Sequence, residues 1–172
     1  MVIINATRGD LGTIFQLYDE AIEFQKTVFD KHWLGFDEAF VNREIDEQRL
    51  WKIVEDGRIA CIFSVAYADP VIWGEKSDDP AMYIHRIVTS RDFRGRGYAR
   101  KITEWAKGHA AANNLRYVRM DTWGDNRKLI DYYTDCGFTF LGLITPDLSV
   151  DLPKHYAGID LCLFEIDIET LK

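Results

Sequence analysis

The segment from Thr89 to Lys101 has residue types and a spacing that could bind an anion. Within it, Gly95 and Gly97 alternate with arginines, and five basic residues and one acid lie between Arg91 and Lys101. An apolar run typical of a buried strand precedes the segment, and apolar residues at helical spacing follow it. A glycine-rich turn between a strand and a helix presents backbone N–H groups and the positive end of the helix dipole. The sequence therefore predicts a turn that binds the phosphate groups of a cofactor.

Two familiar phosphate-binding patterns fit this turn poorly. The P-loop pattern G-x-x-x-x-G-K-S/T is absent from the chain. The dinucleotide pattern G-x-G-x-x-G matches Gly95 and Gly97, but Arg100 stands where its third glycine belongs. Asp121 ends the next predicted strand at about the distance expected of a ribose-binding acid. A bulky arginine does not suit the close packing of helix and strand, however, which argues against a dinucleotide.

A second group of residues follows the turn after one predicted helix and one predicted strand. It consists of Asn126, the pair Tyr132-Tyr133 and the pair Gly137-Phe138. The segment from Arg94 to Ala99 resembles the Q/R-x-x-G-x-G/A motif of the GNAT superfamily of acyl-CoA N-acyltransferases, and the second group resembles that family's second signature. The two matches occur in the expected order, and the resemblance covers about residues 2 to 143.

The resemblance implies an enzyme that binds acetyl-CoA and moves its acetyl group to a primary amine of a small molecule or peptide. In this family the amine attacks the thioester directly, and the pantetheine arm of the cofactor runs along the strand before the turn. Main-chain groups do that binding, so apolar side chains on the strand are no obstacle. The acetyl-CoA contacts implied for this chain are Ile87, Val88, Thr89, Arg94, Gly95, Arg96, Gly97, Tyr98, Ala99, Asn126 and Tyr133.

Tyr133 matches the position of the family's proton donor. A phenol with a pKa near 10 stays protonated at neutral pH and can donate its proton to the departing thiolate. A tyrosine on the core face of an amphipathic helix is the structural alternative. Asn126 is implied to contact or position the pantetheine arm, and a helix N-cap is the alternative role for it.

The general base is less well defined by the pattern. Many relatives carry a glutamate near the position of Tyr83, and this chain has none there. In a regular strand His85 shares one face with Tyr83 and Ile87, and its intrinsic pKa suits a base. His85 is therefore a candidate catalytic residue, with a hydrogen-bonded core histidine as the alternative. His155, in a long predicted loop before the last strand, is a second candidate, with a surface role as its alternative.

The resemblance also implies where the acceptor enters, namely opposite the cofactor, between the first two helices and the loop that joins the last strands. Aromatic and acidic residues gather in these segments, and such a lining would suit a cationic, partly apolar amine. Solvated loop acids explain the same residues equally well, and no residue identifies the acceptor. An acyl-CoA-binding sensor without transferase activity is the alternative function. The residues concerned are Phe24, Phe29, His32, Trp33, Phe36, Trp123, Tyr156, Glu23, Asp30, Asp37, Asp147 and Asp151.

The composition excludes several other classes of protein. The chain has 172 residues, 47% of them hydrophobic, which suits one globular domain with a sizeable core. A formal net charge of −7 argues against general nucleic-acid binding, which needs a broad basic surface. No run approaches the roughly 18 apolar residues of a membrane span, and no signal peptide is evident, so a cytoplasmic protein is expected. Cys61, Cys136 and Cys162 lack metal or redox spacing and are expected to be reduced core thiols.

The order of the predicted elements indicates the fold. Strands are expected at 2–6, 50–55, 59–67, 82–89, 116–121, 138–143 and 159–166, with helices beginning near 11, 37, 97 and 126. Residues 25–35 are expected to be irregular and residues 69–80 to form a polar loop, while Asp56-Gly57 is a strong hairpin signal. This order predicts an α/β fold with a mixed, mostly antiparallel sheet of about seven strands and helices on both faces, in one domain over residues 1–172. No metal site is predicted, and homodimerisation is left open.

Overall fold

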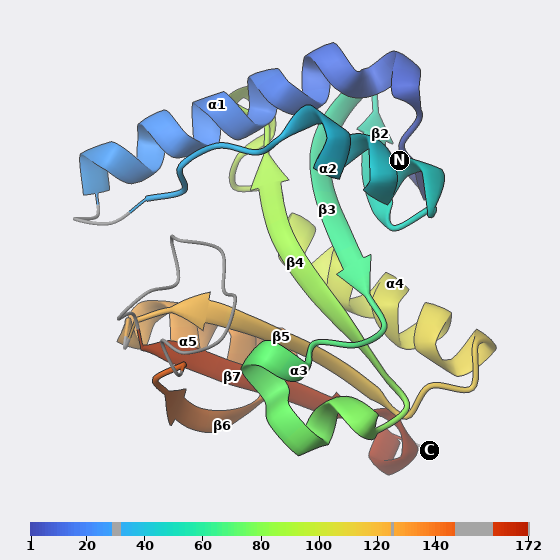
Figure 1. The fold of residues 1–172 in the computed structure, drawn as a ribbon, viewed down its shortest axis with the longest axis vertical. Helices are drawn as coiled ribbons and strands as arrows, with labels where there is room; N and C mark the ends of the chain where they lie inside the picture. The colour runs from blue at the N-terminus through green and yellow to red at the C-terminus, as the bar shows by residue number, and fades with distance from the viewer. Residues whose placement is uncertain (29–31, 125, 147–159, 172) are drawn as a thin grey trace. The chain divides into compact units, whose positions relative to one another are not determined.

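The protein consists of two compact units, shown in Figure 1 as a computed structural model. Residues 1–28, 32–124, 126–146 and 160–171 are described. Unit 1 comprises Met1–Val65 and Arg86–Tyr98, and unit 2 comprises Ala66–His85 and Ala99–Lys172. Among the described residues, no helix is long and apolar enough to cross a membrane.

One seven-stranded sheet connects the elements. Its strands are β1 (Val2–Asn5), β2 (Leu50–Glu55), β3 (Arg58–Ala66), β4 (Ala81–Thr89), β5 (Tyr117–Trp123), β6 (Thr139–Ile144) and β7 (Leu161–Asp167). Their order in the sheet is β1-β2-β3-β4-β5-β7-β6. The pairs β1/β2, β2/β3, β5/β7 and β7/β6 are antiparallel, whereas β4/β5 is parallel. The prediction of a mixed, mostly antiparallel sheet of about seven strands is therefore confirmed.

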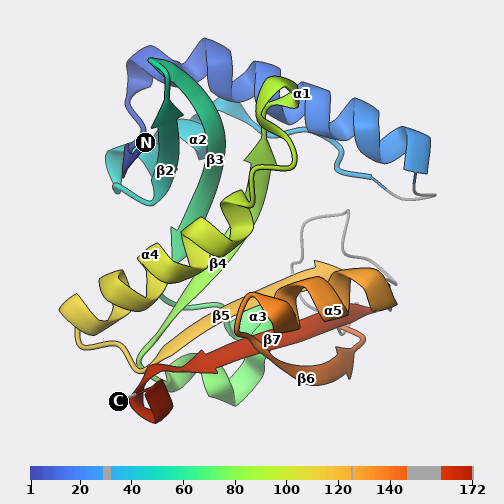
Figure 2. The ribbon, with the colours of Figure 1, turned by 180° about the vertical axis from the view of Figure 1, so that it is seen from behind.

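Helices connect these strands. They are α1 (Leu11–Val28), α2 (Glu38–Asp46), α3 (Pro70–Trp73), α4 (Tyr98–Ala112) and α5 (Arg127–Asp135), with short 3₁₀ helices η1 (Arg8–Asp10), η2 (Gly74–Asp78), η3 (Arg91–Phe93) and η5 (Ile168–Leu171). In unit 2, Trp73 of α3 packs with Leu163 of β7, whereas Tyr133 of α5 packs against the adjacent Phe164, 5.4 Å between ring centroids. Because neighbouring strand residues point to opposite faces, α3 and α5 cover opposite faces of the unit 2 strands (Figures 1 and 2).

In unit 1, α1 and α2 bury their apolar stripes in the same core. Asp37 starts α2 as its N-cap, where its Oδ1 accepts a hydrogen bond from the Ala39 N–H at 2.6 Å. Asp56 and Gly57 have φ values of 54° and 71°, the left-handed pair that a two-residue hairpin between β2 and β3 requires. The core cluster contains Ala6, Ile14, Leu17, Tyr18, Val41, Ile45, Leu50, Ile62 and Val88.

Two segments expected to lack helix contain it. Helix α1 extends to Val28 and thus covers the start of the segment 25–35, and the segment 69–80 holds α3 and η2. Asp69 caps α3, because its Oδ1 accepts a hydrogen bond from the Ile72 N–H at 3.4 Å and a proline occupies the first helical position. Ile72 and Trp73 are buried, but a four-residue helix is too short to show an apolar period in the sequence.

Strand β4 departs from a regular pleat near its middle. Its first part, from Ala81 to Ile84, pairs in parallel with residues 117–120 of β5, but Arg86 has a φ of 50°, in the left-handed region. A left-handed residue is typical of a bulge, so the regular strand from which Ile87 was expected to share the face of His85 is interrupted at Arg86.

Contacts within unit 1 hold Arg86 in this conformation. Its guanidinium pairs with the buried Glu44 and donates to Ser64 Oγ at 2.8 Å. It also lies 5.3 Å from the ring centre of Phe36 and 5.0 Å from that of Phe40. A left-handed conformation of a non-glycine residue costs on the order of 1 kcal/mol or more, and these contacts offset that cost.

Candidate functional site

The predicted turn lies between β4 and α4, where its backbone is open on one side. Gly95 and Gly97 have φ values of 76° and 69°, and a Cβ built on either residue would meet nothing within 4 Å. The Ser90 N–H donates to the Ala60 carbonyl at 2.9 Å, which ties the start of the turn to β3. Both glycines are therefore needed for their left-handed backbone, and the first N–H groups of α4 follow directly.

Glu55 at the end of β2 fixes the far end of the turn. Its carboxylate accepts a hydrogen bond from the Tyr98 hydroxyl at 2.8 Å and pairs with Arg96 at 2.7 Å. Tyr98 is buried, and burial together with this hydrogen bond raises the pKa of its phenol to about 12. Sequence reasoning missed Glu55, because it belongs to no motif and lies 43 residues before Tyr98.

The arginines of the turn already have partners within unit 1. Arg94 lies over the ring of Phe24, 4.6 Å from its centre, and Arg96 lies 4.8 Å from the ring centre of Phe93. Arg91 Nε is 3.9 Å from a carboxylate oxygen of Glu20. The arginine charges are thus partly compensated, so the main-chain groups and the helix start are the stronger features of this turn for an anion.

The end of β4 leads directly into the turn, as predicted. Val88 is buried in the unit 1 core, Ile87 is half-buried, and the Thr89 hydroxyl donates to Cys61 Sγ at 3.5 Å. Burial raises the pKa of Cys61 to about 12, so that this thiol stays protonated at neutral pH. Cys61, Cys136 and Cys162 are all buried and form no disulfide bond, which confirms their prediction as core thiols.

Helix α5 begins and ends where the second motif predicts. Asn126 is its N-cap, because its Oδ1 accepts hydrogen bonds from the N–H groups of Lys128 at 3.1 Å and Leu129 at 3.4 Å. Gly137 follows the helix with a φ of 103°. The N-cap role of Asn126 is therefore confirmed, and its contact with a cofactor stays a prediction.

Tyr133 is nine-tenths buried on α5 and is surrounded by aromatic rings. Its ring centre lies 5.4 Å from those of Tyr132 and Phe164 and 6.2 Å from that of Phe138. These edge and tilted contacts fix the plane of the phenol ring. Such packing suits a core tyrosine and equally suits a proton donor whose hydroxyl must be held in one direction.

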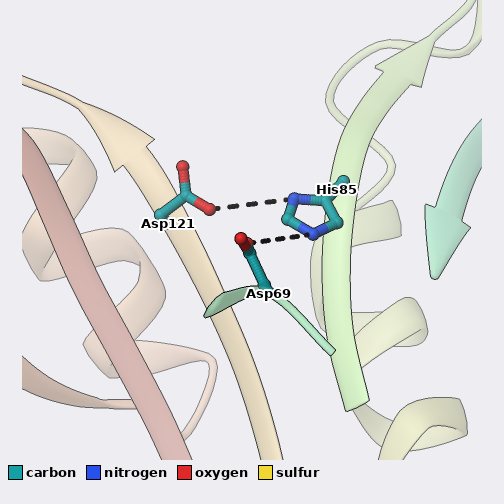
Figure 3. Close-up of side chains that lie close together, drawn as sticks. All are labelled: Asp69, His85 and Asp121. Carbon is teal, nitrogen blue, oxygen red and sulfur yellow. Dashed lines mark ion pairs between the residues drawn. The ribbon is translucent and has the colours of Figure 1, made fainter. Parts of the chain in front are cut away.

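His85 lies in a cluster with two carboxylates that the sequence did not suggest (Figure 3). Asp69 Oδ2 is 3.5 Å from His85 Nε2, and Asp121 Oδ1 is 3.7 Å from His85 Nδ1. The three side chains come from the cap of α3, from β4 and from β5, and all belong to unit 2. Only 13% of the Asp69 side chain and 4% of the Asp121 side chain are exposed.

The two carboxylates of this Asp69–His85–Asp121 cluster are poorly satisfied. Asp69 Oδ2 and Asp121 Oδ1 are buried and have no hydrogen-bond partner among the described residues. Burial raises the pKa of Asp69 to about 6 and that of Asp121 to about 7, and the neighbouring charge of Asp69 adds to the second shift. The cluster can therefore exchange protons near neutral pH.

The Asp69–His85–Asp121 cluster also has residue types that could bind a metal ion. One ligand atom from each residue lies within 4.8 Å of the others, a spacing at which a metal ion could be held. The two carboxylates face different nitrogens of the His85 ring, however, and an ion takes only one of them. The expectation of no metal site is neither supported nor contradicted by this geometry.

Several residues predicted to line an acceptor site have structural roles in unit 1. Trp33 and Phe36 pack on the core cluster, Asp37 caps α2, and Glu23 pairs with Lys26 at 2.7 Å. Trp123 of unit 2 packs against Leu161, Leu163 and their neighbours. The candidate base His155 and the acceptor residues Phe29, Asp30, Asp147, Asp151 and Tyr156 lie outside the described residues.

The raised pKa of Asp121 predicts a pH-dependent stability. The folded chain holds this proton up to about pH 7, whereas an unfolded aspartate releases it near pH 4, so the free energy of unfolding falls as the pH rises between these values. Asp121→Asn removes the ionisation and should raise the free energy of unfolding at pH 8 by up to about 4 kcal/mol, at about 1.4 kcal/mol for each pKa unit. Urea unfolding at pH 5 and pH 8 measures the effect.

The exposed Asp78, which lies outside the cluster, is the matched control for this experiment. Asp78→Asn should change the free energy of unfolding by less than about 0.5 kcal/mol at both pH values. An Asp121→Asn variant with wild-type stability at pH 8 would show that Asp121 carries no desolvation penalty in the folded chain.

Solved acetyltransferase structures share this fold. An acetyltransferase of the GNAT family from Listeria monocytogenes 4b F2365 matches with a TM-score of 0.75 and 20% identity, over 96% of this chain and 94% of that one. The protein yncA from Salmonella typhimurium, a putative acetyltransferase solved with its cofactor acetyl-CoA, matches with a TM-score of 0.69 and 15% identity, over 98% and 94%. At these identities the likeness shows the fold.

Sequence comparison points in the same direction. The uncharacterized N-acetyltransferase YesJ of Bacillus subtilis (strain 168) is 24% identical over 145 residues, which cover 80% of this chain and 81% of YesJ. The family model described as the acetyltransferase (GNAT) family matches residues 13–138, which include the glycine turn and α5. Because that match spans well over half of the sequence, the chain belongs to the GNAT family of acetyltransferases, whose acyl donor is acetyl-CoA.

Proposed function

We propose that this chain transfers the acetyl group of acetyl-CoA to a primary amine of a small molecule or a peptide. The observation that carries the proposal is the left-handed backbone of Gly95 and Gly97 immediately before α4, with open space beside both glycines. This geometry supports binding of the CoA pyrophosphate by main-chain N–H groups at the start of the helix. Membership of the GNAT family supports the same cosubstrate.

In this proposal the main chain of unit 1 binds most of the cofactor. Residues 94–99 hold the pyrophosphate, and the backbone of Ile87, Val88 and Thr89 contacts the pantetheine arm. Glu55 holds Arg96 and Tyr98 by an ion pair and a hydrogen bond, so it acts as a positioning residue for the turn.

The side chains of unit 2 carry the proton transfers. The incoming ammonium ion gives one proton to His85, and the neutral amine attacks the thioester carbon. When the C–S bond breaks, the Tyr133 hydroxyl donates its proton to the sulfur of CoA. The second amine proton then returns to the Tyr133 oxygen, so the net reaction releases one proton, which His85 passes to water.

The surroundings of both residues support these roles. A carboxylate lies near each ring nitrogen of His85, and negative charge favours the imidazolium that forms when His85 accepts a proton. The rings of Phe138 and Phe164 fix the plane of Tyr133.

The acceptor amine does not follow from the fold alone. Solved neighbours include a spermidine N-acetyltransferase from Vibrio cholerae, studied as a chimera, and a ribosomal-protein-alanine N-acetyltransferase from Brucella melitensis. One acts on a small amine and the other on a protein, and both share this fold at 15% and 16% identity. A cytoplasmic location and a homodimer are part of this proposal only as expectations.

The turn is tested by Gly97→Val. Valine at a φ of 69° is strained and places methyl groups in the space beside the turn, so the affinity for acetyl-CoA should fall at least tenfold. Isothermal titration calorimetry measures it. Gly108→Val, at an exposed site on α4 without a positive φ, is the matched control and should bind normally. Unchanged affinity in the folded Gly97→Val variant would refute the role of the turn.

Tyr133→Phe tests the proton donor. Loss of the hydroxyl should lower kcat by about a hundredfold or more, while the dissociation constant for acetyl-CoA changes little. Release of the CoA thiol with a panel of primary amines measures kcat. Tyr132→Phe, at the neighbouring exposed position, is the control and should keep its activity. A normal kcat in Tyr133→Phe would leave this residue a packing role only.

His85→Gln tests the base. A base must be unprotonated to act, so kcat should rise with pH through its titration, and the variant should lose this ascending limb together with most of its activity. His109→Gln is the control, because His109 lies on α4 beside Tyr67, whose hydroxyl is 2.9 Å from His109 Nε2. An ascending limb that persists in His85→Gln would exclude His85 as the base.

A further inference from the structure

The Asp69–His85–Asp121 cluster differs from the other buried charges of unit 2. Arg119 is 1% exposed and donates to Asp79 at 2.6 Å, to Glu165 at 2.7 Å and to the Tyr83 hydroxyl at 3.1 Å. Those distances are typical of closed, charge-assisted hydrogen bonds. In the cluster, by contrast, the distances between carboxylate oxygen and ring nitrogen are 3.5 Å and 3.7 Å, and neither oxygen has a hydrogen bond from any residue that the structure describes.

A structural ion pair does not explain this arrangement. A buried carboxylate oxygen without a partner carries a large desolvation cost, and an ion pair repays it only with short hydrogen bonds. The same unit forms such bonds around Arg119, on the same face of β5 and two residues before Asp121. Asp121 is 4% exposed, and its Oδ1, which has no hydrogen-bond partner in the described parts of the chain, is directed toward His85 (Figure 3). A buried carboxylate oxygen without a hydrogen bond indicates a site where a bound ligand supplies the missing donor.

The donor pattern of a primary ammonium group matches the cluster. An ammonium nitrogen presents three N–H donors and no acceptor. The cluster offers two acceptors beside the imidazole of His85, namely Asp69 Oδ2 and Asp121 Oδ1 (Figure 3). The same three side chains also meet the spacing for a metal ion, with one ligand atom from each within 4.8 Å of the others. The N–H donors of an organic ammonium ion match the unsatisfied carboxylate oxygens, and the test below includes a metal ion as the rival.

We propose that Asp69 and Asp121 bind the acceptor amine in its protonated form and hold its nitrogen beside His85. The inference rests on the proposed transfer to an amine and names the substrate class, a primary alkylammonium ion rather than a neutral nucleophile. Both carboxylates stay charged while His85 receives one proton from the bound ammonium. The half-buried Trp123, two residues beyond Asp121 on the same face of β5, provides an apolar surface for the carbon chain.

A binding experiment that needs no turnover tests this proposal. The protein saturated with CoA is labelled with ¹³C at the aspartate carboxyls, and the two signals are assigned with Asp69→Asn and Asp121→Asn. Addition of n-butylammonium chloride should saturate, shift both signals and lower the pKa of both carboxyls, because a bound cation favours the charged form. The neutral analogue n-butanol should do neither.

The variants give the second arm of the test. Asp69→Asn and Asp121→Asn should each weaken n-butylammonium binding at least tenfold, while the exposed control Asp78→Asn binds like wild type. Both cluster variants conserve side-chain size, and a thermal melt confirms that they fold. Equal binding in all four proteins, absence of saturable shifts, or equal shifts with n-butanol would each overturn the proposal.

Two further measurements separate this inference from its rivals. Stoichiometric MnCl₂ that broadens both carboxyl signals and displaces n-butylammonium would assign the cluster to a metal and overturn the amine site. Acetyl-CoA affinity, measured on the same variants, should stay within about threefold of wild type, since the cluster does not belong to the turn. Failure of the wild type to bind acetyl-CoA would refute the proposed function itself, independently of the result with n-butylammonium.

Discussion

The parallel pairing of β4 with β5 is the contact on which both candidate sites depend. An antiparallel pair can be closed by a short turn, but a parallel pair needs a long crossover connection. Here the crossover leaves the end of β4 and contains α4, so a helix must begin close to the strand end. The glycine turn lies at that point. The same pairing sets Tyr83 opposite Arg119 and thereby brings His85 near Asp121, two residues further along each strand.

Some charged side chains in the interior of this protein have short hydrogen bonds to their partners, whereas others have oxygens without a hydrogen bond among the described residues. Arg119 in unit 2 is buried and Arg86 in unit 1 is half-buried, and both are surrounded by acceptors and rings, so each contributes to a defined local structure. Among the described residues, Asp69 Oδ2 and Asp121 Oδ1 have no hydrogen-bond partner, and burial raises the pKa of both carboxyls. The chain thus forms hydrogen bonds to Arg86 and Arg119, but its described parts form none to these two oxygens of the Asp69–His85–Asp121 cluster. A buried cluster of this kind lowers the stability of the fold and is typical of a functional site.

The sequence allowed the local features of the fold to be predicted. Asp56-Gly57, the turn glycines Gly95 and Gly97, and the N-cap Asn126 all impose backbone conformations that depend only on near neighbours. These features were sufficient to place the family's two motifs on the correct elements. When only one sequence is available, residues with strict backbone requirements are therefore the most reliable signals of local structure.

Non-local contacts account for what the sequence did not reveal. Glu55 reaches Tyr98 across 43 residues, and Asp69 meets His85 only because the short α3 folds back against β4. The sequence suggests only a ribose-binding role for Asp121, because its nearness to His85 follows from the register of the parallel pair β4/β5. The regular strand expected along β4 is also interrupted at the left-handed Arg86, which pairs with Glu44, a residue that no local pattern connects to it.

In the proposed enzyme the backbone binds the cofactor, whereas side chains bind the amine and transfer protons. The proposed cofactor site uses main-chain groups of unit 1, which many sequences can present once the glycines are in place, and relatives of 15–20% identity indeed keep the fold. The proposed proton transfers and amine binding use side chains of α3, β4, β5 and α5, where one substitution changes the chemistry. Trp73 packs 5.6 Å from Tyr83 and fixes α3, so it sets where Asp69 can lie. Acceptor choice should therefore depend on the packing of α3 and leave the cofactor turn unchanged.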